Sequence, residues 1–339
     1  MTAVAERRTA KDLDVVLEVD GLTVDIRTIT GTVRAVDDVS FAARRGETLA
    51  LLGESGCGKS MTATALVGLL EAVAEVVEGT AQLGGVDLFS VGRAKRREMA
   101  GTELAIVFQD ALTALNPLYT VGTQLAEPFR IHHGLSAKQA KAKAVELMAR
   151  VGIPQPETRL NSYPHQFSGG MRQRLLIAMA VALNPSVLIA DEPTTALDVT
   201  VQAQIMALLR DLRAEYRMAV VLITHDLALV AEEADRVAVM YAGNIVETGP
   251  VAEVFANPRH PYTKGLLNSV PVNARRGDEL KSIGGTPPDL HAIPTGCVYQ
   301  ARCPLARDIC AATRPTLAGG DRKAACHFPE EVDPGREED

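Results

Sequence analysis

The octapeptide GESGCGKS at residues 53–60 constrains the fold more than any other part of the sequence. It has the form G-x-x-x-x-G-K-[ST], which binds phosphate where it joins a buried strand to a helix, and the apolar run at 48–53 supplies such a strand. Lys59 brings positive charge to the β- and γ-phosphates, and Ser60 offers a hydroxyl to Mg²⁺. Backbone N–H groups surround the phosphates where the loop has glycine: Gly53, Gly56 and Gly58. The predicted nucleotide-binding set is completed by the neighbouring residues Glu54, Ser55, Cys57 and Met61. Cys57 contributes its backbone and not its side chain.

Three further apolar runs are predicted to be buried strands: LAIVFQ at 104–109, SVLIAD at 186–191 and AVVLIT at 219–224. Helical spacing of apolar residues extends over 136–152 and 200–216. Strands that alternate with helices indicate an α/β fold with a parallel sheet. In the early runs LEVDGLTVDI and VRAVDDVSFAA, apolar and polar residues alternate, which is more typical of an antiparallel sheet.

Changes in composition divide the chain. Residues 1–14 are charged without an apolar h-region and are predicted to be a flexible leader and not a signal peptide. Residues 15–255 carry the α/β pattern, interrupted by a helical subdomain at about 110–180. From 256 to 339 proline and glycine are dense, so this C-terminal extension is predicted to need something other than its own apolar residues to hold it together.

The run VLIADE at 187–192 supplies acids at the end of a predicted strand. Asp191 is placed to hold Mg²⁺ through water, and Glu192 to act on the water that attacks the γ-phosphate. A strand that ends in Asp-Glu is more often an ordinary strand end than a metal site. The phosphate-binding loop at 53–60, called the P-loop below, reverses that expectation.

A second predicted anion site lies in FSGGMRQR at 167–174, more than a hundred residues after the P-loop. A serine and two glycines precede a helical run there and expose backbone N–H groups at a helix N-terminus. The predicted ligands of this anion are Ser168, Gly169 and Gly170.

Taken in chain order, these motifs resemble those of the ATPase subunits of ABC transporters. The set comprises GESGCGKS (Walker A), Gln109 in VFQD (Q-loop), FSGGMRQR (signature), VLIADE (Walker B), Asp198 in TTALD (D-loop) and His225 in ITHD (H-loop). The resemblance covers nearly the whole chain and implies an ATP-binding domain with an antiparallel β subdomain and a helical subdomain. It also implies that two ATPase domains pair head to tail, so that the signature of one holds the γ-phosphate bound by the other.

Several roles follow from this resemblance. Gln109 would contact Mg²⁺, His225 would bond to the γ-phosphate and position the water, and Asp198 would communicate across the dimer. The predicted catalytic residues are therefore Glu192, His225 and Lys59, and the Mg²⁺ set is Ser60, Gln109 and Asp191. Residues 21–40 contain no aromatic side chain to stack on adenine, which leaves Ile26 or Val33 to contact the base.

The runs FSGGM, 116–129 and 256–271 resemble one subfamily, the ATPase subunits of bacterial dipeptide and oligopeptide importers, whose relatives also move nickel and glutathione. The resemblance implies a second ATPase subunit, two membrane permeases and an extracytoplasmic binding protein as partners, with permeases docking near 110–130. It places the chain at the cytoplasmic face of the membrane. A soluble ABC ATPase acting on nucleic acid or ribosomes is the alternative from another class, and the net charge of −7 disfavours it.

Four of the five cysteines occur in the last 45 residues with the spacing C-x5-C-x6-C-x15-C: Cys297, Cys303, Cys310 and Cys326. The absence of a CxxC pair weighs against a zinc ribbon. A [4Fe–4S] cluster that staples the extension is the favoured interpretation, because four thiolates suit it and relatives in the resembled subfamily are reported to carry one. Zinc and free thiols remain the alternatives.

Overall fold

The computed structural model describes residues 14–110, 114–195, 197–269 and 283–332. The chain divides into two units, each assembled from segments that are separate in the sequence. The first unit has three segments: Met1–Glu18, Ala42–Thr48 and Gln82–Val221. The second has three others: Val19–Phe41, Leu49–Ala81 and Leu222–Asp339. The predicted leader at 1–14 lies almost wholly outside the described residues, and the other predicted domain boundaries stay a prediction.

The first unit contains the parallel strand pair β6 (Leu104–Val107) and β7 (Val187–Asp191). All five residues of β7 are buried, as expected of a strand with both faces covered. Short β5 (Val86–Asp87) pairs with the end of β4 (Ala74–Leu83). The helices of this unit are α2 (Arg93–Met99), α4 (Val121–His133), α5 (Ala137–Arg150), α6 (Pro156–Arg159), α7 (Gly169–Val181) and α8 (Val199–Tyr216).

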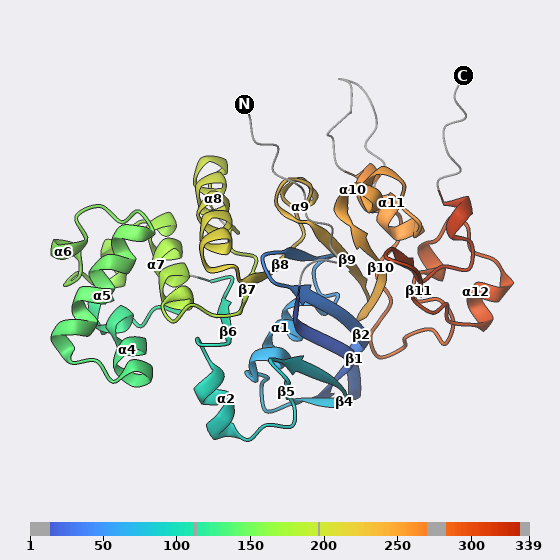
Figure 1. The fold of residues 1–339 in the computed structure, drawn as a ribbon. Helices are drawn as coiled ribbons and strands as arrows, with labels where there is room; N and C mark the ends of the chain where they lie inside the picture. Colours follow the sequence, from blue (N-terminus) through green and yellow to red (C-terminus); the bar gives the residue numbers. More distant parts are fainter. Residues whose placement is uncertain (1–13, 111–113, 196, 270–282, 333–339) are drawn as a thin grey trace. The chain divides into compact units, whose positions relative to one another are not determined.

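Helices α4, α5 and α7 pack against one another and form the helical part of this unit (Figure 1). Their starts follow from local sequence, because Thr120, Ser136 and Ser168 each cap a helix with the side-chain oxygen. Ser136 and Gln139 form a full capping box. The helices predicted at 136–152 and 200–216 are confirmed as α5 and α8.

The second unit holds most of two sheets. One has the order β2 (Gly31–Arg44), β1 (Val15–Thr28), β4. In the other, β3 (Thr48–Leu52) pairs in parallel with β9 (Arg236–Tyr241), and β9 pairs antiparallel with β10 (Asn244–Pro250). The order continues through β12 (Lys323–Ala324) to β11 (Ala318–Gly319), both antiparallel. β8 (Ala219–Thr224) runs from the first unit into the second. The strands predicted at 48–53, 104–109, 186–191 and 219–224 are confirmed.

The C-terminal extension is part of the second unit and shares a hydrophobic core with strands of that unit. Helix α10 (Val251–Ala256) ends where the extension begins, and the described helices of the extension are α11 (Pro261–Asn268) and α12 (Asp308–Ala312). Helices α1 (Lys59–Val67) and α9 (Leu227–Glu233) belong to the same unit. Tyr241, Tyr262 and Tyr299 come from three separate segments, and their ring centroids lie 4.6 to 5.5 Å apart. Contacts of this kind stabilise the extension through its aromatic residues.

His260 lies inside this core and predicts a pH dependence of stability. Burial lowers its pKa to about 3, and its ring Nδ1 accepts a hydrogen bond of 3.1 Å from the Tyr262 N–H. The unfolded chain binds a proton near pH 6.5, so this contribution to stability is complete above pH 6.5 and is lost as the pH falls below it. Between about pH 6.5 and about pH 3 we expect this residue to lower the free energy of unfolding by about 1.4 kcal/mol for each pH unit of acidification.

Urea unfolding between pH 7.5 and pH 5 measures this slope. His260→Gln is expected to unfold at lower urea at pH 7.5 but to lose less stability on acidification than the parent chain. Parallel losses in the two proteins would show that His260 does not cause the slope.

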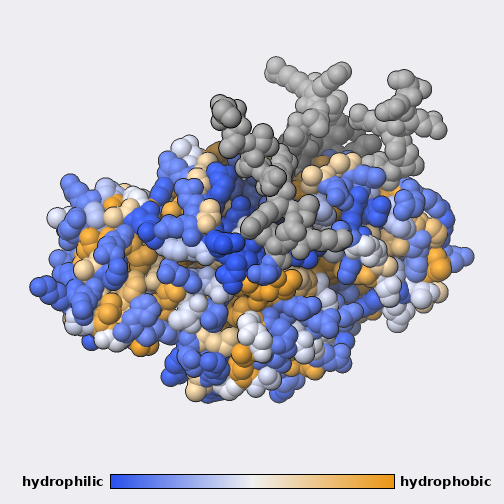
Figure 2. Space-filling model, viewed as in Figure 1, coloured by the Kyte–Doolittle hydropathy of each residue, from blue (hydrophilic) through white to orange (hydrophobic). Residues whose placement is uncertain are grey.

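Hydrophilic residues predominate on the face shown in Figure 2, with smaller apolar patches between them. Among the described residues, no helix has both the length and the apolar character needed to cross a bilayer.

Candidate nucleotide site

The P-loop lies in the second unit, between β3 and α1, as the motif requires. Gly58 has φ +105°, and a Cβ there would lie 2.7 Å from the carbonyl oxygen of Ala35. A Cβ on Gly53 would lie 2.2 Å from the carbonyl oxygen of Met240. Close packing thus excludes a side chain at both positions and leaves a bare backbone of the kind that can surround an anion.

Lys59 is the first residue of α1 and is 5% exposed. Its Nζ donates to the carbonyl oxygens of Gly53 at 2.8 Å and Glu54 at 2.9 Å. The ammonium group is therefore held inside the loop by loop carbonyls. Ser60, the predicted Mg²⁺ ligand, is exposed next to it, as are Ser55 and Gly56.

Glu54 makes contacts that the sequence did not predict. Its backbone N–H donates to the Tyr262 hydroxyl at 2.9 Å, and its carboxylate accepts two hydrogen bonds from Arg302. These partners lie 208 and 248 residues away along the chain, so no local pattern points to them.

The predicted acids and the Q-loop glutamine lie together in the first unit. Gln109 follows β6 and Asp191 ends β7, and these strands are parallel neighbours. The Gln109 side-chain amide donates to Glu192 Oε2 at 2.9 Å, and the Thr195 hydroxyl donates to the same oxygen at 2.8 Å. Asp191 is 5% exposed. The structure therefore brings Gln109 next to the predicted general base.

Glu192 has an unusual backbone conformation, with φ +45°. Residues other than glycine rarely adopt this left-handed region, and where they do the surrounding structure holds them there. Here the carboxylate is tied by two hydrogen bonds, and the strand before it is fully buried. The conformation fixes where the carboxylate points.

Ser168 and Gly169 are exposed at the start of α7. The Ser168 hydroxyl accepts from the Met171 N–H at 3.4 Å, so it caps the helix. A Cβ on Gly170 would lie 2.6 Å from a methyl carbon of Val201 on α8. Gly170 is therefore also required for the packing of α7 on α8, a role that the sequence did not indicate.

The D-loop and H-loop residues lie at helix starts. Asp198 caps α8 by accepting from the Val201 N–H at 3.0 Å, which its position before an apolar helical run would have indicated. His225 is exposed between β8 and α9. Of the two residues expected near adenine, Val33 is 6% exposed and Ile26 is partly exposed.

The predicted metal centre in the extension is wrong. Within the described part of the chain, no group of three or more His, Cys, Asp or Glu residues is arranged to hold a metal ion. The four cysteines line one small cavity beside His260 and Tyr299. Burial raises the pKa of the Cys297 and Cys326 thiols and raises that of Cys303 to about 11.

The ABC transporter family model matches residues 36–195, and the model of the oligopeptide/dipeptide transporter C-terminal region matches residues 246–310. A dipeptide transport ATP-binding protein of Escherichia coli K12, DppD, is 46% identical over 92% of this chain and 96% of its own. The DppD protein of Bacillus subtilis 168 is 50% identical over 88% of this chain and 89% of its own. A putative peptide import ATP-binding protein of Brucella abortus 2308 is 49% identical over 91% of this chain and 94% of its own.

Solved structures of ATP-binding cassettes are similar to the chain. The dimeric cassette MJ0796 bound to ADP and Pi has a TM-score of 0.62 and 25% identity, covering 69% of this chain and 98% of its own. CbiO1 of Clostridium perfringens, part of the ABC transporter complex cbiONQ, has a TM-score of 0.60 and 29% identity. The match covers 72% of this chain and 91% of CbiO1.

Proposed function

The chain belongs to the family of ABC transporter ATP-binding subunits, and from this premise we propose that it hydrolyses ATP to power the import of dipeptides and oligopeptides across a membrane. The observation that carries this proposal is the match of the C-terminal region, residues 246–310, to a region named for oligopeptide and dipeptide transporters. The relatives named for peptide import match over most of their own length, which supports the same cargo.

Nucleotide binding is assigned to the P-loop. Lys59 would bind the β- and γ-phosphates, and the glycines would admit their oxygens to the backbone N–H groups. Ser60, Gln109 and Asp191 offer the hydroxyl, amide and carboxylate oxygens that suit Mg²⁺. When bound, Mg²⁺ neutralises charge on the phosphates.

Hydrolysis is assigned to Glu192 and His225. Glu192 would accept a proton from the attacking water as a general base, and His225 would donate a hydrogen bond to the γ-phosphate. The hydrogen bonds from Gln109 and Thr195 orient the Glu192 carboxylate before substrate arrives. A base held in place costs little reorganisation during the reaction.

Dimerisation is assigned to the signature. Ser168, Gly169 and Gly170 would bind the γ-phosphate of a nucleotide held by a partner ATPase domain, and Asp198 would contact that partner. The dimeric, ADP- and Pi-bound cassette MJ0796 supports this arrangement. ATP would then favour the closed dimer, and its hydrolysis would release it.

The proposed partners are a second ATPase subunit, two permeases that dock near 110–130, and an extracytoplasmic peptide-binding protein. The chain would lie on the cytoplasmic face of the membrane as a peripheral subunit, which requires no spanning helix of its own.

Uptake of a radiolabelled dipeptide by cells tests the cargo. Deleting this chain is expected to abolish uptake, and restoring it as Glu192→Gln is expected to leave uptake abolished. Unchanged dipeptide uptake together with loss of nickel or glutathione uptake would contradict peptide import.

A further inference from the structure

An ion pair joins the C-terminal extension to the P-loop. The two terminal nitrogens of Arg302 donate to the two carboxylate oxygens of Glu54 at 2.8 and 3.0 Å. The Arg302 side chain is 4% exposed and that of Glu54 is 29% exposed. Because this pair is bidentate and largely shielded from water, its geometry is more specific and its attraction is less screened than in an ordinary surface pair.

Glu54 is anchored at all its polar groups. Its N–H donates to the Tyr262 hydroxyl, its carbonyl accepts from Lys59 Nζ, and its carboxylate accepts from Arg302. Two of these three partners belong to the segment after residue 260. The extension therefore holds the residue whose carbonyl positions the phosphate-binding lysine.

Arg302 is itself fixed in place. Its Nε donates to the Gly284 carbonyl at 2.9 Å, and its guanidinium lies 5.6 Å from the ring centroid of Tyr241 and 6.0 Å from that of Tyr299. The hydrogen bond from Arg302 to Glu54 raises the pKa of Arg302 above its ordinary value. A permanent positive charge thus lies against the P-loop in a rigid aromatic setting.

A carboxylate inside a phosphate loop opposes the loop's function. Released from Arg302, the Glu54 carboxylate would repel a triphosphate and compete for Lys59, which lies on the same loop. The repulsion would grow with the charge of the nucleotide.

We propose that Arg302 is a positioning residue for nucleotide binding: it neutralises Glu54 and holds the P-loop in the form that accepts phosphates. The C-terminal extension would then set the nucleotide affinity of the site. This inference rests on the proposed function, since it presumes that the P-loop binds ATP.

Nucleotide affinities of the purified full-length chain test it, with ATP, ADP and adenosine as probes at low and at high salt. Arg302→Gln is expected to weaken ATP binding about tenfold and ADP binding less, while adenosine binding stays within about twofold. Adding Glu54→Gln to this variant is expected to restore ATP affinity to within about twofold of the parent chain.

The double variant separates the charge effect from a structural one. A purely structural role would weaken all three ligands alike and would not be rescued by the second substitution, so either result would overturn the proposal. Unchanged ATP affinity in Arg302→Gln would also overturn it. If that variant does not fold, Glu54→Gln alone decides. Removing the carboxylate is expected to raise the affinity for ATP relative to that for adenosine, and a fall in this ratio contradicts the charge argument.

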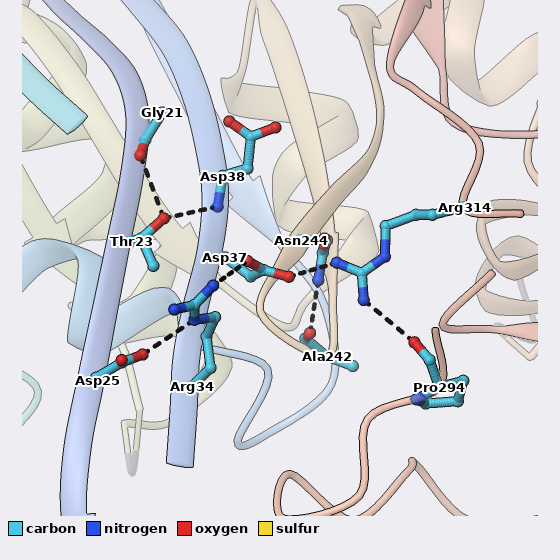
Figure 3. A network of polar contacts seen from close by, with 10 residues as sticks. All are labelled: Gly21, Thr23, Asp25, Arg34, Asp37, Asp38, Ala242, Asn244, Pro294 and Arg314. Carbon is cyan, nitrogen blue, oxygen red and sulfur yellow. Dashed lines mark hydrogen bonds and ion pairs between the residues drawn. The ribbon is translucent and has the colours of Figure 1, made fainter. Parts of the chain in front are cut away.

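Arg314 provides a matched control in the same extension. It donates to Asp37 on β2 and to the Pro294 carbonyl, within a polar network that includes Arg34 and Asp25 (Figure 3). Arg314→Gln therefore removes an ion pair between the extension and another segment without touching the P-loop. We expect ATP affinity to stay within about twofold of the parent value. Failure of the parent chain to bind ATP would instead refute the proposed function.

Discussion

Glu192→Gln is expected to lower steady-state ATP hydrolysis at this chain's own site by about 100-fold or more, because general-base catalysis contributes about 10²–10⁴ to rate. An amide of the same shape keeps an oxygen for the hydrogen bonds from Gln109 and Thr195 but cannot accept the proton of the attacking water. ATP binding is expected to persist, so the variant should accumulate as a closed, ATP-bound dimer.

Phosphate release and size-exclusion chromatography with light scattering, both with Mg²⁺ and ATP, measure these two effects. Glu103→Gln is a suitable control, because Glu103 is also a carboxylate of the first unit that accepts a hydroxyl hydrogen bond, from Ser186 before the start of β7. The control is expected to hydrolyse ATP normally. Undiminished hydrolysis in Glu192→Gln would remove Glu192 from the role of general base.

The strands β3 and β7 at the site follow from the sequence because each is a short apolar run. TLALL and VLIAD both end where a chemically active loop begins, so the pattern predicts the strand and places the loop. The helix starts at Ser136 and Ser168 are equally local, since a single side-chain oxygen caps each.

Other parts of the site depend on contacts between distant residues. Gly170 is required both for an exposed helix start and for packing against Val201, and only the structure shows the second reason. The positive φ of Glu192 and the pairing of Glu54 with Arg302 have no signal at all in the local sequence.

The cysteines show why spacing alone was insufficient. Their spacing indicated four metal ligands, yet spacing carries no information about how side chains are arranged in space, and the described residues hold no group of three or more that could bind a metal ion. The extension was expected to need a staple because it contains few apolar residues. It packs instead through Tyr262 and Tyr299 on a core that includes Tyr241 of β9, outside the extension.

Lys59→Ala is expected to weaken ATP binding about 100-fold, because charge-assisted hydrogen bonds contribute roughly 1.5–3 kcal/mol each and a P-loop lysine serves two phosphates. The variant also leaves the Gly53 and Glu54 carbonyls without the donor that now joins them, so the loop loses order. Both effects act on the phosphates, and adenosine binding is therefore expected to change little.

Calorimetric titration with ATP and with adenosine measures these affinities, and circular dichroism checks that the variant is folded. Lys95→Ala is a fitting control, because Lys95 is a half-exposed lysine on α2 whose ion pair with Glu98 lies outside the predicted nucleotide-binding set. It is expected to bind ATP as the parent chain does. A folded Lys59→Ala variant that retains full ATP affinity would mean that the buried ammonium only braces the loop carbonyls. The phosphate-binding role would then have to pass to the backbone N–H groups alone.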